Sequence, residues 1–170
     1  MVSVDSIKAL REQTGAGIMD CKRALADANG DLGKATEALK EKGLAKAAKS
    51  ASRETKEGVV HSYIHGGGRV GALVEISCET DFVGRTADFQ GLAHDVAMQV
   101  AAMAPKYIDA SDMPADDEAN PDEVCLLRQP FIKDPGKSIA DLVTELAARV
   151  GENVRVRRFS RFALGEDEEA

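Results

Sequence analysis

The sequence has no tryptophan and few aromatic residues, which make up 4% of its 170 residues. Its core must therefore be built mainly from alanine, valine, leucine and isoleucine, a composition that suits helices packed on a small sheet. It also lacks any apolar run near the roughly 20 residues that a membrane span needs, and its first residues lack the apolar centre of a signal peptide. We therefore expect a cytoplasmic protein with no membrane partner, built as one ordinary domain or as a small domain beside a modest one.

Cysteine is scarce, with only Cys21, Cys78 and Cys125. An odd number of widely spaced cysteines excludes a disulfide framework. Each stands in an apolar pattern, which predicts a buried thiol. The alternative is a thiol enzyme using Cys21 or Cys78, which would need an exposed thiol of low pKa beside a base.

An excess of positive charge is also missing, since the formal net charge is -7. This balance argues against direct binding of nucleic acid through its phosphates. The basic residues are nevertheless concentrated in 34–56 and 155–161, and the acidic residues in 109–123.

The sequence contains no convincing motif for binding a nucleotide or a metal ion. No Walker-type phosphate loop is present, and the glycines of 66–71 fit G-x-G-x-x-G only in a context where a strand follows them, which predicts a hairpin instead. His61 and His65 lie on a predicted strand, where a spacing of four residues places them about 13 Å apart, too far to share an ion. His94 stands alone on a predicted helix. We therefore expect no metal and no cofactor.

Helical periodicity dominates residues 1–43. Three short helices are expected there: one capped by Ser3 or Asp5, one with Ile18, Cys21 and Leu25 on its buried face, and one that begins after Asp31 and ends at Gly43. Residues 44–57 are rich in Ala, Lys and Ser and are interpreted as a linker with partial helix.

Residues 58–165 predict a sheet covered by helices. The expected strands are Val59–His65, Val70–Cys78 and Asn153–Leu164, with helices over Phe89–Val100 and Ile139–Val150. Residues 109–123 are expected to form an exposed loop, and 166–170 an acidic tail. The fold class is thus α+β, with an N-terminal helical domain, a linker and an antiparallel sheet covered by helices.

Two short features, the segment Cys78–Val83 and the residue Met19, are candidates for binding a partner. In the segment Cys78–Val83 a strand gives way to a helix. Thr80 or Asp81 can cap that helix with Phe82 and Val83 turned inward, or the turn can expose an acid–aromatic pair as a binding anchor. Met19 falls off the apolar face of its helix, which is either harmless exposure or part of a docking patch.

Three motifs resemble the bacterial elongation factor Ts family, in the right order and over about 3–165. They are Arg11–Leu25 (REQTGAGIMDCKRAL), Cys78–Val83 (CETDFV) and Gly151–Phe159 (GENVRVRRF). The resemblance implies a guanine-nucleotide exchange factor, not an enzyme, that binds elongation factor Tu in its GDP-bound and nucleotide-free forms. It implies that residues 1–43 are a three-helix, ubiquitin-associated-like domain and that a sheet-and-helix core follows, and we expect this core, 58–165, to serve also as the dimerisation domain.

The resemblance also implies roles for individual residues. Arg11, Ile18 and Met19 would dock on the partner. Thr80, Asp81, Phe82 and Val83 would form the turn that dislodges the partner's magnesium ion, with Asp81 and Phe82 as its main residues.

The chain departs from the family pattern in several places. Gly84 and Thr86 follow the turn where many relatives have Ala and Asn, and the segment 109–130 is shorter. The sheet-and-helix unit occurs once where longer relatives repeat it, so we expect a homodimer through the last strand, with Phe159 and Phe162 on opposite faces. The alternative function, which rests on residues 3–43 alone, is a peptide- or ubiquitin-like-binding module without exchange activity.

Overall fold

A computed structural model describes residues 2–166. The chain forms two compact units: one of residues up to Arg53 together with Thr144–Asn153, and one of Glu54–Val143 together with the chain from Val154 onward. The helix α7 (Ile139–Val150) contributes to both. Of the predicted acidic tail, residues 167–170 lie outside the described residues.

The first unit begins with three helices: α1 (Val4–Thr14), α2 (Ile18–Asp27) and α3 (Leu32–Ser50). Ser3 caps α1 by accepting a hydrogen bond from the Ser6 backbone, and Asp31 caps α3 by accepting one from Lys34 N at 3.1 Å. These side chains satisfy backbone N–H groups that have no partner within the helix. The helices share a core of six buried residues, Leu10, Cys21, Ala24, Leu25, Ala35 and Leu39.

Two details of this unit correct the sequence prediction. The third helix does not end at Gly43 but continues to Ser50, so residues 44–50 are helical. A Cβ at Gly43 would lie 3.1 Å from the Ala148 Cβ of α7, so the glycine serves a close contact between helices. Ile18 is 57% exposed and not part of the core, because it occupies the first position of α2, ahead of the residues that contact α1 and α3.

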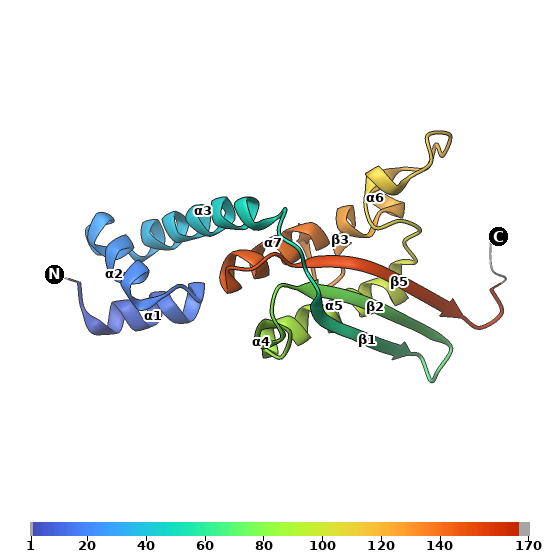
Figure 1. Cartoon of the computed structure of the whole chain (residues 1–170), viewed down its shortest axis with the longest axis horizontal. Coiled ribbons are helices and arrows are strands. Elements are labelled where there is room, and N and C mark those ends of the chain that lie inside the picture. Colours follow the sequence, from blue (N-terminus) through green and yellow to red (C-terminus); the bar gives the residue numbers. More distant parts are fainter. Residues whose placement is uncertain (1, 167–170) are drawn as a thin grey trace. The chain divides into compact units, whose positions relative to one another are not determined.

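The second unit is built on a three-stranded antiparallel sheet in the order β1-β2-β5 (Figure 1). The strands are β1 (Glu57–His65), β2 (Val70–Cys78) and β5 (Arg155–Ala163). The helix α5 (Ala87–Met103) packs against β1, β2 and β5, and it covers the face on which Ala72, Val74 and Ile76 are buried. The predicted α+β class is therefore confirmed. Phe159 pairs with Val74 on the covered face, whereas Phe162 pairs with Gly71 on the open face.

The chain between α5 and α7 is more ordered than the expected loop. It contains the short elements η1 (Ala110–Asp112), α6 (Pro121–Val124) and η2 (Leu126–Arg128), followed by a small hairpin of β3 (Pro130–Phe131) and β4 (Asp134–Ser138). Two fully buried glutamines tie it to α5. Gln99 Nε2 donates to Gln129 Oε1 at 3.2 Å, and Gln99 Oε1 accepts from the Ile132 backbone at 3.0 Å. Such a satisfied buried network fixes the position of an otherwise irregular segment.

Candidate partner-binding site

The turn after β2 forms a short helix, α4 (Asp81–Gly84), that displays one aromatic side chain. Thr80 caps it, with its hydroxyl oxygen accepting from Val83 N at 3.4 Å. Val83 is only 5% exposed, whereas Phe82 is 78% exposed. Of the two alternatives, the inward arrangement holds for Val83 and the exposed arrangement holds for Phe82, because adjacent helical residues point about 100° apart.

The backbone beneath this turn is held by close contacts with two neighbouring strands. The Cys78 thiol donates to the Thr80 carbonyl, with 3.1 Å between sulfur and oxygen. Gly84 lies against Gly58 at the start of β1: a Cβ at Gly84 would meet the Gly58 Cα at 3.5 Å. Gly58 itself has a φ of 143°, and any side chain there would overlap the Ile76 carbonyl of β2. These contacts with β1 and β2 therefore fix the backbone of the turn, while the Phe82 side chain remains exposed to solvent.

Gly58 is a residue of this site that the sequence motifs do not indicate. The available signal was a glycine at the beginning of a β-rich run, which often marks a close approach of two backbones. The contact with Gly84 could not be read from the sequence, since it depends on where the turn docks.

Asp81 supplies a negative charge beside the exposed ring. Its carboxylate forms an ion pair with Arg85, one helical turn along, with 2.8 Å between Oδ2 and Nη2. Both side chains are largely exposed, and an exposed pair of this kind contributes at most about 1 kcal/mol. The carboxylate can therefore exchange Arg85 for another donor at little cost.

The first unit presents a second group of exposed residues. Ile18 and Met19 at the start of α2 are 57% and 62% exposed, and Arg11 on α1 is also exposed. Exposed apolar side chains at adjacent positions form the kind of surface that partners bind. These residues belong to a different unit from the Phe82 turn, so each group is considered by itself.

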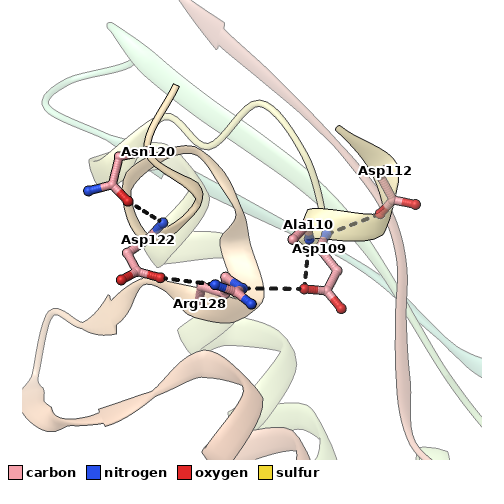
Figure 2. Close-up of polar contacts among 6 residues, drawn as sticks. All are labelled: Asp109, Ala110, Asp112, Asn120, Asp122 and Arg128. Carbon is pink, nitrogen blue, oxygen red and sulfur yellow. Dashed lines mark hydrogen bonds and ion pairs between the residues drawn. The ribbon is translucent and has the colours of Figure 1, made fainter. Parts of the chain in front are cut away.

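The segment 109–128 is closed by its own polar contacts (Figure 2). Arg128 lies between two carboxylates, with Nη1 3.4 Å from Asp122 Oδ1 and Nε 3.9 Å from Asp109 Oδ1. Asp109 and Asp112 also form a reciprocal capping box around η1. Nearby, Tyr107 donates to Asp117 at 2.7 Å, and this hydrogen bond raises the pKa of the tyrosine. The hydrogen bond from the Ala119 backbone, and then the one from Tyr107, lower the pKa of Asp117. These contacts make the shortened segment a folded loop.

Other chemistries find little support. All three cysteines are buried, as predicted, and burial raises the pKa of the Cys125 thiol, which disfavours a thiolate nucleophile. Gly66, Gly67 and Gly68 all have positive φ and join β1 to β2, so a strand and not a helix follows them. Within residues 2–166, no cluster of three or more His, Cys, Asp or Glu side chains is arranged to hold a metal ion. No helix in the same range is both long and apolar enough to cross a membrane.

Comparison with known proteins gives a consistent family. The family model described as Elongation factor TS matches residues 29–121. The chain is 50% identical to an elongation factor Ts of Carboxydothermus hydrogenoformans, over 98% of this chain and 90% of that protein. It is 47% identical to the elongation factor Ts of Moorella thermoacetica, over 98% of this chain and 97% of the relative.

The alignments extend over 196 positions, more than the 170 residues of this chain, so the relatives carry residues that it lacks within the matched region. Identity at this level over nearly the whole length leaves no other assignment: the chain belongs to the elongation factor Ts family.

Proposed function

We propose that the protein is a guanine-nucleotide exchange factor that binds elongation factor Tu·GDP and promotes release of GDP. Membership of the family already gives it a role in translation elongation, and we expect it to act in the cytoplasm, where bacterial translation takes place. The observation that carries the proposal is the turn at Thr80–Val83, which holds Phe82 in solvent on a fixed backbone beside the Asp81 carboxylate.

The physical action of the turn would be a wedge. Bound GDP is held largely through charge, with a magnesium ion neutralising its phosphates. Burial of the Phe82 ring between partner side chains contributes about 1.5–3 kcal/mol. That free energy is enough to displace groups that line the magnesium site, while Asp81 competes for donors nearby.

The exchange then follows from reciprocal coupling. If the protein weakens GDP binding by a given factor, GDP weakens binding of the protein by the same factor. Each tenfold change corresponds to about 1.4 kcal/mol. The single burial of Phe82 is therefore large enough to accelerate GDP release appreciably, and no bond is made or broken.

Docking would rest on the first unit. Ile18 and Met19 offer exposed apolar area, and Arg11 adds a donor and a charge. An apolar anchor of this kind supplies affinity without competing for the nucleotide site. The two functions would thus be divided, with residues of the first unit binding and the turn of the second unit acting on the nucleotide.

The decisive experiment is release of fluorescent mant-GDP from elongation factor Tu, measured by stopped flow with and without this protein. We expect the release rate to increase with protein concentration and to saturate. An unchanged rate at concentrations where calorimetry shows binding would contradict the exchange function and favour the alternative, a binding module without exchange activity.

We also propose that the protein is a homodimer, through the open face of its sheet. That face carries exposed apolar residues on all three strands: Val60, Ile64, Leu73 and Phe162. Glu75 and Arg158 form an ion pair on the same face, with 2.6 Å between oxygen and nitrogen. A second copy related by a two-fold axis would place the apolar side chains of the two copies against each other. Glu75 and Arg158 of both copies would lie in the same interface.

The acidic tail begins with an ion pair inside the chain. Glu166, its first residue, pairs with Arg161 of the same chain at 2.7 Å, so this arginine is neutralised without a second copy. Light scattering tests the dimer: we expect twice the chain mass of 18.1 kDa for the wild type and a monomer for Phe162→Glu. A wild-type monomer at high micromolar concentration would exclude it.

A further inference from the structure

All three histidines of the chain lie close to Tyr63, where β1 and α5 pack against each other in the second unit. His61 and His65 are on β1 and His94 is on α5, thirty-three residues after His61. The His61 Nε2 and the His94 Nδ1 share a hydrogen bond, with 3.3 Å between the two nitrogens, and the tautomers of the rings decide which one donates. The Tyr63 ring packs edge-on against His94 and stacks on His65, with centroid separations of 5.5 and 5.8 Å.

The separation of the two ring nitrogens matches that of a metal chelate. A zinc ion binds imidazole nitrogen at 2.0–2.1 Å, so two such nitrogens are about 2.9 Å apart at a right angle and about 3.4 Å apart at a tetrahedral angle. The observed 3.3 Å falls within this interval. One of the two rings donates the shared proton, so metal binding requires that ring to carry its proton on its other nitrogen; a small rotation of each ring then directs both lone pairs toward a common point.

The pair is also held in place before any ion binds. The helix α5 packs directly on β1, so the two histidines come from rigid elements. Tyr63 supports the His94 ring from the side. A preorganised pair loses less conformational entropy on binding than two free side chains would.

We propose that His61 and His94 form a two-nitrogen binding site for a divalent transition metal ion. Imidazole ligands suit Cu²⁺, Ni²⁺ and Zn²⁺, and the affinity of such sites is usually greatest for Cu²⁺. Water would complete the coordination. His65 is already hydrogen-bonded to Tyr63 at 2.9 Å, and Asp95 is paired with Lys133 at 2.6 Å.

This site revises the expectation that the chain binds no metal. On the strand alone, His61 has no neighbour within reach, and only the packing of α5 supplies one. A bound ion would connect β1 to α5, two elements that both contact α4 in the second unit. The proposal is independent of partner binding and of exchange.

The test is titration of the full chain, without a histidine tag, with Ni²⁺ and with Zn²⁺ by calorimetry. We expect one ion per chain, and a loss of at least about tenfold in affinity when either His61 or His94 becomes glutamine. The matched control is His65→Gln, which removes a histidine of the same cluster and strand and should leave the affinity unchanged. Equal losses in all three variants, or no saturable binding to the wild type, would overturn the proposal.

A second readout does not depend on the variants folding. In imidazole NMR spectra of the wild type, Zn²⁺ should shift the ring signals of His61 and His94 and leave those of His65 in place. A third measurement returns to the variants: Zn²⁺ should raise the thermal midpoint of the wild type and of His65→Gln, but not of His94→Gln. Shifts confined to His65, or a midpoint that rises equally in His94→Gln, would contradict the proposed ligands.

Discussion

Replacing Phe82 with alanine should separate partner binding from folding. The side chain is 78% exposed in the free protein, so its ring contributes little to the folded state. The cap of α4 uses the Thr80 hydroxyl and the Val83 backbone, and neither is altered by the substitution. We therefore expect the free energy of unfolding to change by no more than about 0.5 kcal/mol, as for an ordinary surface substitution.

The effect on the partner should be much larger. Full burial of a phenylalanine side chain contributes about 1.5–3 kcal/mol relative to leaving it exposed. Each tenfold change in an equilibrium or rate constant corresponds to about 1.4 kcal/mol, so loss of the ring should lower the efficiency of exchange roughly 10- to 150-fold. The alanine retains a methyl group, which favours the lower half of this interval.

Val83→Ala is the matched control, since it changes the adjacent residue of the same turn. Val83 is 5% exposed, and removal of two buried methyl groups together with the cavity left behind costs about 2 kcal/mol. For a chain of this size that corresponds to a thermal midpoint about 4–8 °C lower. Below that midpoint the variant should still display Phe82 and retain most of its exchange activity.

The assay is stopped-flow release of mant-GDP from elongation factor Tu, with each variant well below saturation, together with thermal unfolding of the variant alone. We expect opposite results for the two variants. Phe82→Ala should keep its stability and lose exchange activity, whereas Val83→Ala should lose stability and keep most of its exchange activity. Wild-type exchange by Phe82→Ala would refute the wedge. A thermal midpoint for Phe82→Ala as low as that of Val83→Ala would refute the exposed position of the ring.

Three further predictions concern the fold. Gly84→Ala should stabilise the protein by up to about 1 kcal/mol in urea unfolding, because its Cβ would make only ordinary contacts at 3.5 Å or more, whereas Gly58→Ala should destabilise it severely through overlap with the Ile76 carbonyl. The hydrogen bond from Lys42 lowers the pKa of Asp20 below its ordinary 3.8, so this pairing stabilises the fold above that pH and is lost as the pH falls through the lowered value. Asp20→Asn should therefore unfold more easily than the wild type at neutral pH and equally easily in strong acid. The Cys125 thiol should react with a thiol reagent only as fast as the protein unfolds, and rapid labelling of the native state would contradict its burial.

Local signals in the sequence predicted much of this fold. The strand predicted over Val70–Cys78 has the same bounds as β2, and capping residues such as Asp31 predicted where helices begin. Thr80 and Asp81 were the two expected caps of the short helix, and Thr80 is the cap. Such features depend on residues within one or two turns of each other, which a single sequence contains.

What depends on distant packing could not be predicted in this way. Gly43 has the sequence signature of a helix end, yet it lies inside α3 because Ala148 approaches it closely. The hairpin of β3 and β4 is short and contains Pro135 and Gly136, so its composition indicates a loop. His61 and His94 are brought together only by the docking of α5 on β1.

The two interpretations of the Cys78–Val83 segment, an inward anchor and an exposed aromatic residue, each hold for a different residue of the same turn. Val83 anchors the turn in the core, and this anchoring is what allows Phe82, one position earlier, to remain in solvent without collapsing onto the surface. Because Gly84 and Gly58 have no side chains, the backbone of α4 lies close to the start of β1. This close contact limits how far α4 can move when the ring is pressed against a partner. An exposed aromatic ring on a flexible loop would lose part of its burial free energy in ordering that loop. Held on this turn, Phe82 can deliver most of that free energy to the partner.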